Sequence, residues 1–163
     1  MATAKPNVLL IGTGGVGTIV AYEIHTVGKS TLSVVVRSDY AKVKDQGWEI
    51  NSSEYGKVES WKPDAIYSSV ENAAKSGAVF DYVVITTKNL PDIIKPEELA
   101  VPVVTVGKTT VVLIQNGFDI GRPFITKYPQ NVCVSGVTHI GSHNHDGVIT
   151  QTQKNKSFIM VTI

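Results

Sequence analysis

One short stretch near the N-terminus constrains the fold of this chain more than any other feature. The apolar run Val8–Ile11 leads directly into the pattern G-x-G-x-x-G, and a helical pattern follows. A continuous apolar run is typical of a parallel strand buried on both faces. A strand, a glycine turn and a helix in this order predict that the turn binds the pyrophosphate of a dinucleotide. A glycine-rich turn that binds nothing is the alternative.

The helix after the turn is predicted from periodicity. Apolar residues recur in steps of three and four: Val16, Ile19, Val20, Ile24 and Val27. Gly28 is expected to end this helix as its C′ residue. The helix N-terminus offers unpaired N–H groups and about half a positive charge, which suits a pyrophosphate.

The glycines of the turn have separate expected tasks. Gly12 would make the tight turn, Gly14 would let the backbone approach the phosphates, and Gly17 would let the helix lie close to the strand. The whole turn is therefore predicted to bind the cofactor: Gly12, Thr13, Gly14, Gly15, Val16 and Gly17.

The end of the second predicted strand, residues 31–36, indicates which dinucleotide is bound. An acidic residue there would bind the ribose hydroxyls of NAD. This chain has Arg37 at that place, 20 residues after Gly17, and its only other arginine is Arg122. The guanidinium group suits a ribose phosphate, since each pair of unit charges about 4 Å apart is worth roughly 4 kcal/mol before desolvation. We therefore predict NADP(H). A solvated Arg37, or a longer strand that gives Asp39 the acidic role and favours NAD, are the alternatives.

The bulk properties predict one ordinary globular domain over residues 1–163. The net charge is +1, so nothing indicates nucleic acid or a membrane surface as a partner. No segment approaches the roughly 18 to 20 apolar residues of a membrane span, and the N-terminus has no apolar signal core. Cys133 is the single cysteine, which excludes an internal disulfide and fits a reducing, cytoplasmic location.

The rest of the chain repeats strands and helices, which predicts an α/β fold: a doubly wound, Rossmann-type parallel sheet with helices on both faces. Further strands are expected at residues 80–85, 109–114 and 131–137, and short helices at residues 70–75 and from residue 96 onward. Residues 47–61 are expected to form short extended segments at an edge or in an excursion. Their aromatic side chains, Trp48, Tyr55 and Trp61, would cover apolar surface.

The last third of the chain has a different character. Residues 139–147 are polar, and extra antiparallel strands are predicted at residues 148–152 and 157–163, around a polar hairpin link. A zinc site formed by His139, His143, His145 and Asp146 is an alternative for the polar stretch. A polar hairpin loop is the more common outcome for such a run, so we predict no metal.

Two polar residues follow predicted central strands and are the candidate catalytic groups. Lys88 lies a few residues after the strand at 80–85, and Asn116 follows the strand at 109–114. Ligands of doubly wound sheets bind beyond the carboxyl ends of the strands, so both residues would share a crevice with the glycine turn. The alternatives are a solvated loop lysine and a turn asparagine before Gly117.

Together these residues resemble the ketopantoate reductase (2-dehydropantoate 2-reductase) family. The motifs that carry the resemblance are the glycine turn, Arg37, Thr87-Lys88, Gln115-Asn116-Gly117, and Thr138-His139 followed by Gly147. The family reduces the ketone of ketopantoate with NADPH on the route to pantothenate and coenzyme A. The resemblance implies that Thr86, Thr87, Lys88 and Asn116 also contact the cofactor, and that Lys88 and Asn116 act near the reacting ketone. A lysine ammonium and an asparagine amide suit the alkoxide that forms when a ketone accepts hydride.

The resemblance also implies a second, mostly helical domain, which supplies the general-acid lysine and further substrate contacts. This chain ends before that domain, and Lys154 and Lys156 do not match its motif. We therefore expect the cofactor half of a reductase, as a fragment or a free-standing relative, with little activity alone. Its partners would be NADPH and a small 2-oxo acid, and a homo-oligomer is left open. A non-catalytic NADP(H) sensor is the alternative function.

Overall fold

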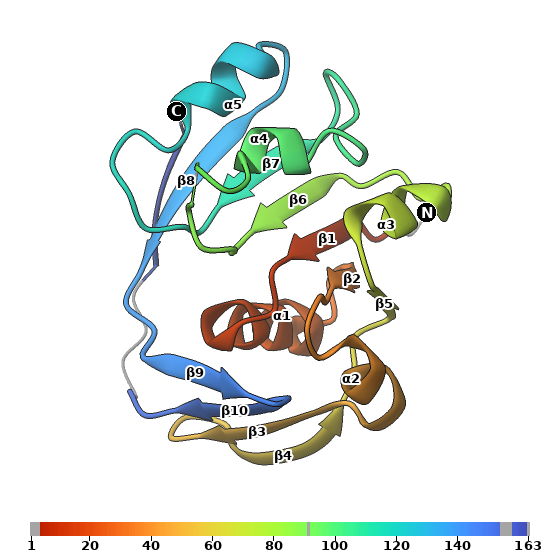
Figure 1. Ribbon diagram of the computed structural model, residues 1–163, viewed down its shortest axis with the longest axis vertical. Coiled ribbons are helices and arrows are strands. Elements are labelled where there is room, and N and C mark those ends of the chain that lie inside the picture. The colour runs from red at the N-terminus through yellow and green to blue at the C-terminus, as the bar shows by residue number, and fades with distance from the viewer. Residues whose placement is uncertain (1–3, 91, 154–157, 163) are drawn as a thin grey trace.

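The computed structural model describes residues 4–90, 92–153 and 158–162, and places helix α1 between a large and a small β-sheet (Figure 1). The large sheet has the strand order β11-β8-β7-β6-β1-β2-β5. Its strands are β1 (Asn7–Ile11), β2 (Thr31–Val35), β5 (Ala65–Tyr67), β6 (Tyr82–Ile85), β7 (Thr110–Leu113), β8 (Cys133–Thr138) and β11 (Phe158–Thr162). The six strands other than β11 pair in parallel, whereas β11 pairs antiparallel with β8. The predicted Rossmann-type sheet is confirmed.

Helices lie on both faces of this sheet because its strands direct apolar side chains to both. On one face, Val8 and Leu10 of β1 pack into a core with α1 (Gly15–Val27). On the other face, Leu9 and Ile11 pack into a second core with α3 (Val70–Lys75), α4 (Pro96–Leu99) and α5 (Arg122–Lys127). A short helix, α2 (Tyr40–Gln46), follows β2. As predicted, Gly28 ends α1 in the left-handed conformation, with φ of 68°.

The small sheet covers the side of α1 that faces away from the large sheet (Figure 1). Its order is β4-β3-β10-β9, with β3 (Trp48–Ser52), β4 (Gly56–Trp61), β9 (Ser142–His145) and β10 (Val148–Gln151). Residues 47–61 therefore do form an excursion, and Trp48 and Trp61 are buried in the core around α1. The parallel pairing of β10 with β3 joins segments about 100 residues apart, which no local pattern signals.

The predicted hairpin of the last two strands is wrong. β10 lies in the small sheet between β3 and β9, whereas β11 lies in the large sheet at the edge of β8. Each strand covers an edge that would otherwise be unpaired, and Ile149 of β10 is fully buried against α1. The polar link with Lys154 and Lys156 lies outside the described residues. The polar run at 139–147 contains β9, a strand that the sequence analysis did not predict.

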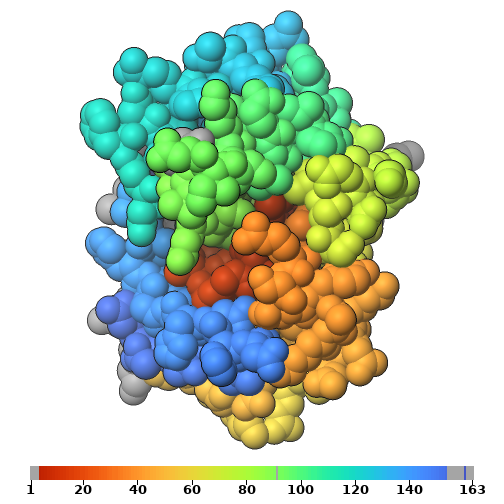
Figure 2. Space-filling model, in the orientation of Figure 1, coloured from red at the N-terminus to blue at the C-terminus, as the bar shows by residue number. Residues whose placement is uncertain are grey.

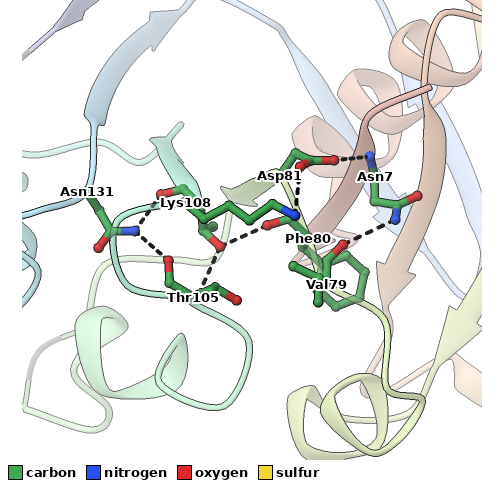
Figure 3. A network of polar contacts seen from close by, with 8 residues as sticks. Asn7, Val79, Phe80, Asp81, Thr105, Lys108 and Asn131 are labelled. Atoms are coloured by element: carbon green, nitrogen blue, oxygen red, sulfur yellow. Dashed lines mark hydrogen bonds and ion pairs between the residues drawn. The ribbon is translucent and has the colours of Figure 1, made fainter. Parts of the chain in front are cut away.

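A polar network joins the amino ends of four neighbouring strands, β1, β6, β7 and β8 (Figure 3). The Asp81 carboxylate accepts a hydrogen bond from the N–H of Asn7 (2.8 Å) and lies 3.7 Å from Nζ of Lys108. The buried Thr109 hydroxyl donates to the Phe80 carbonyl (2.8 Å). The Asn131 amide donates to the carbonyl of Thr109 (2.8 Å). These contacts stabilise the edge of the sheet opposite to the carboxyl ends, where a Rossmann-type fold binds its ligand.

Candidate functional site

The turn between β1 and α1 requires glycine at two positions for packing alone. Gly12 has φ of 104°, and a Cβ there would lie 2.8 Å from the Thr87 backbone nitrogen. A Cβ on Gly17 would overlap the Gly12 carbonyl oxygen and lie 2.5 Å from Oγ1 of Thr86. These two glycines therefore let the strand, the turn and the helix approach one another closely.

Gly14 differs, because a Cβ at this position would meet no atom within 4 Å. It is the N-cap residue of α1, and the helix has neither a side-chain cap nor an acidic residue in its first turn. The N–H groups of this turn are thus left for another acceptor. A hollow lies here in Figure 2, with the red residues of the turn and α1 as its floor and orange, green and blue segments around it. Open space at an uncapped helix N-terminus fits an anion such as a pyrophosphate.

The rest of the turn is held in place by the small sheet. A Cβ on Gly15 would lie 2.6 Å from backbone atoms of β9, so this strand packs directly on the start of α1. The Thr13 carbonyl accepts hydrogen bonds from the side chains of Thr18 (3.1 Å) and Asn144 (3.1 Å). Val16 packs, partly buried, against the core around α1. Gly15 is therefore packed against β9 and the Val16 side chain against the core, whereas the Cβ position of Gly14 is open.

Thr86 and Thr87 follow β6 and pack against the glycine turn. The Thr86 hydroxyl hydrogen-bonds with the carbonyl oxygens of Ile11 (3.2 Å) and Gly12. The Gln115 amide, which follows β7, donates to the carbonyl of Thr87 (2.9 Å). Oε1 of this glutamine is buried and has no hydrogen-bond partner among the described residues. Gln115 thus joins the carboxyl ends of β6 and β7 next to the turn.

The candidate catalytic residues lie on the two loops that Gln115 joins. Lys88 and Asn116 are both exposed and follow the ends of β6 and β7. A Cβ on Gly117, whose φ is 146°, would lie 3.2 Å from Nδ2 of Asn89, so the two loops contact each other. Both candidates therefore lie at the carboxyl edge of the sheet that carries the glycine turn.

Arg37 and Asp39 occupy the loop between β2 and α2. The strand ends at Val35, and Arg37 is exposed. Asp39 is the N-cap residue of α2, but its side chain makes no capping hydrogen bond. Its carboxylate instead accepts a hydrogen bond from Nδ2 of Asn144 (2.9 Å). Arg37 is thus the charged residue of this loop that extends into solvent.

The histidine-rich stretch does not form a metal site in the part of the chain that is described. There, no three His, Cys, Asp or Glu side chains come together as a metal would require. Asp146 instead pairs with Lys42 (2.7 Å), and this hydrogen-bonded ammonium lowers the pKa of the carboxylate. Within the same residues, no helix has the length and apolar character that a membrane crossing needs.

The family model of "Ketopantoate reductase PanE/ApbA" matches residues 8–160. The chain belongs to this family. A solved relative, 2-dehydropantoate 2-reductase from Methylococcus capsulatus, is 29% identical with a TM-score of 0.84, over 96% of this chain and 48% of the relative. The uncharacterized protein YDL144C of Saccharomyces cerevisiae is 39% identical in an alignment 156 residues long, and the match covers 83% of this chain and 43% of that protein.

Other matches extend the comparison of folds. A D-mandelate dehydrogenase, solved with NADH and anilino(oxo)acetate, shares the fold with a TM-score of 0.75 and 17% identity, over 94% of this chain and 47% of the dehydrogenase. The chain thus spans less than half of the curated relative from yeast and about half of these solved structures. This agrees with the N-terminal domain of the family.

An apolar groove lies beside α1 on the large sheet, away from the glycine turn. It has a volume of about 570 Å³. It is lined by side chains of β1, β6, β7, β8, β11 and α1, among them Tyr82, Val112 and Met160. Tyr82 and Met160 are 42% and 64% exposed. Parallel sheets are normally covered on both faces, so this surface is suited to contact another polypeptide segment rather than a polar cofactor.

The sequence analysis missed two residues that shape the site. Gln115 was noted only as part of a family motif, and its link to Thr87 depends on the pairing of β6 with β7. Asn144 was part of a polar run with no assigned task, although it contacts both Thr13 and Asp39. Its signal was weak, because a single asparagine three residues before a glycine resembles an ordinary turn.

Proposed function

We propose that this chain binds NADP(H) at the glycine turn and forms the cofactor-binding half of a reductase that acts on a small 2-oxo acid, 2-dehydropantoate. One observation carries the cofactor proposal: the open space at Gly14 lies at an uncapped helix N-terminus, on the same sheet edge as Arg37. The family membership and the solved reductases support the class of reaction. The bound cofactor would supply the hydride.

Arg37 is the group that favours NADP(H) over NAD(H). Arg37 lies two residues after the end of β2, and its exposed guanidinium can form paired hydrogen bonds with a ribose phosphate. The nearest acidic candidate, Asp39, is hydrogen-bonded to Asn144. An exposed pair is screened by solvent, so we expect a net preference of about 1 to 3 kcal/mol, or roughly 5- to 150-fold in Kd.

Lys88 and Asn116 are the proposed polar groups for the substrate ketone. Both side chains are exposed on adjoining loops at the carboxyl edge of the sheet. When hydride reaches the carbonyl carbon, negative charge develops on the oxygen, and a lysine ammonium and an amide N–H stabilise it. Thr86 and Thr87 would act indirectly, since their hydrogen bonds hold the turn and the end of β6.

We further propose that the apolar groove binds the second half of such a reductase. The solved relative from Methylococcus capsulatus is about twice as long as this chain, and the groove leaves part of the parallel sheet uncovered. A helix with an apolar face would bury Tyr82, Val112 and Met160. The general acid would come from that half. Rate losses without a general acid are roughly 10²- to 10⁴-fold, so the chain alone should turn over slowly.

Equilibrium titration followed by an activity assay tests the proposed function. We expect saturable quenching of Trp48 and Trp61 fluorescence, or heat in calorimetry, on addition of NADPH, with weaker binding of NADH. NADPH oxidation with ketopantoate should be slow for the chain alone. It should rise when the part of the yeast relative that this chain does not match is produced separately and added, and Met160→Glu in the groove should reduce that rise. No binding of either dinucleotide would refute the proposal, and NADPH binding without any turnover under either condition would favour a sensor.

A further inference from the structure

We propose that Asn144 sets the cofactor specificity of the site by holding the Asp39 carboxylate away from the ribose. This inference rests on the proposed binding of NADP(H). Asn144 lies on β9, more than 100 residues from Asp39 in the sequence, and its side chain forms hydrogen bonds with Thr13, Asp39 and Gly147. It would therefore act as a positioning residue.

The hydrogen bonds of the Asn144 side chain fix the orientation of its amide group. Nδ2 donates to the Thr13 carbonyl (3.1 Å) and to Oδ2 of Asp39 (2.9 Å). Oδ1 accepts from the N–H of Gly147 (3.0 Å). The Gly147 N–H can only donate, so it fixes which end of the amide faces Asp39. One side chain thus joins the glycine turn to the loop between β2 and α2.

The hydrogen bond with Asn144 takes the place of the capping hydrogen bond that Asp39 could make at the start of α2. Aspartate at an N-cap normally accepts a hydrogen bond from an N–H of the first helical turn. Asp39 is the N-cap residue of α2, yet its side chain makes no such bond. The carboxylate is directed to Asn144 instead, and the ion pair of Lys42 with Asp146 holds α2 against the same β9–β10 turn.

This arrangement determines which charge the cofactor meets. Arg37 and Asp39 are two residues apart on one loop, with opposite charges and opposite preferences: a cation favours the 2′-phosphate, whereas a carboxylate favours free ribose hydroxyls and repels the phosphate. While Asn144 binds Asp39, the exposed Arg37 faces the ligand alone. If Asn144 is removed, the carboxylate can turn toward the ribose or pair with Arg37, and either change weakens the preference for NADPH.

The test is a set of Kd ratios, NADH over NADPH, for the 163-residue chain and four variants. We expect Asn144→Ala to lower the ratio about tenfold, which corresponds to about 1.4 kcal/mol. The double variant Asn144→Ala/Asp39→Asn should restore the ratio, because an amide at position 39 carries no charge. Asp39→Asn alone should leave the ratio within about threefold of the starting protein. Ser52→Ala is the control. It removes the hydrogen bond to Gln151 in the same small sheet and those from the N–H groups of Glu54 and Tyr55 in the adjacent turn, and none of these partners belongs to α2.

The outcomes separate this inference from the proposed function. Equal losses of affinity for both cofactors in Asn144→Ala, or no rescue in the double variant, would refute the role of Asn144 while NADPH binding stands. If Asn144→Ala does not fold, Asp39→Asn decides, because a large change in its ratio would mean that Asp39 already faces the ribose. If the starting protein binds neither dinucleotide, both proposals fail.

Discussion

Replacing Gly14 by alanine should weaken cofactor binding and leave the fold intact, with little change in stability. The backbone at Gly14 has φ of −68° and ψ of −170°, which any residue can adopt. A Cβ there meets no atom within 4 Å, so the methyl group strains nothing. Alanine restricts the unfolded chain, which favours the folded state by about 0.4 to 1 kcal/mol, but it is a poorer N-cap than glycine by a similar amount. The two effects oppose each other, so the melting temperature should change by less than roughly 4 °C.

The same methyl group should have a large effect on binding. It occupies the open space at the helix N-terminus, where a pyrophosphate must come within hydrogen-bonding distance of backbone N–H groups. Hydrogen bonds to a charged group contribute about 1.5 to 3 kcal/mol each. Loss of one or two of them should weaken NADPH binding by about 3 kcal/mol, or roughly 150-fold in Kd. Calorimetric titration measures this loss, and thermal melting of the same samples measures stability.

Two further glycine variants complete the experiment. Gly136→Ala in β8 is the control, since its Cβ would make ordinary 3.5 Å contacts with Ile114 and the Leu113 carbonyl and should leave binding unchanged. Gly17→Ala should destabilise the fold by about 1 to 3 kcal/mol, because its Cβ overlaps the Gly12 carbonyl oxygen. An unchanged Kd for NADPH in Gly14→Ala would refute the placement of the pyrophosphate.

Two other predictions concern stability and reactivity. Thr109→Val should destabilise the fold by about 1 to 3 kcal/mol in urea denaturation, because the Phe80 carbonyl and the Thr105 N–H lose their hydrogen-bond partner. Thr126→Val, at an exposed position, is the control. Equal losses of stability in the two variants would contradict the importance of the network. Burial raises the pKa of Cys133 from 9.0 to about 11, so native thiol should react with iodoacetamide at pH 8.5 far more slowly than unfolded protein. Between about pH 9 and pH 11 the unfolded protein releases the thiol proton while the folded protein keeps it. The free energy of unfolding should therefore be unaffected by Cys133 below about pH 9 and fall as the pH rises toward 11, and Cys133→Ala should abolish that fall. Equal labelling rates in folded and unfolded protein would contradict it.

The local parts of the fold could be predicted from the sequence. The glycine turn, α1 with its Gly28 end and the central strands have continuous apolar or helical patterns, so their periodicity was sufficient. The small sheet could not be assembled in this way, because the pairing of β10 with β3 joins distant segments. The prediction that β10 and β11 form a hairpin was wrong for the same reason, because β10 pairs with β3 in the small sheet and β11 pairs with β8 in the large sheet.

The candidate-site residues that follow the ends of strands could be predicted from the sequence. Those whose hydrogen bonds join the two sheets could not. The placement of Arg37, Lys88 and Asn116 at the carboxyl edge follows from a parallel sheet alone. The hydrogen bond of Asp39 could not be predicted, because its partner Asn144 lies on β9, a strand far away in the sequence. Because this strand was predicted to be a polar loop, nothing in the sequence indicated the hydrogen bond between Asn144 and Asp39, to which we assign the choice between the two cofactors.

The central claim is that Arg37 selects NADP(H) at the glycine turn, and paired titrations of two arginine variants test it most directly. Arg122, the only other arginine, pairs with Asp119 at the start of α5, so Arg122→Ala is a matched control for the loss of one charge. We expect Arg37→Ala to bind NADPH and NADH with nearly equal Kd, while Arg122→Ala keeps the preference for NADPH. Equal Kd values for the two cofactors in the starting protein, or a preference that survives in Arg37→Ala, would contradict the claim.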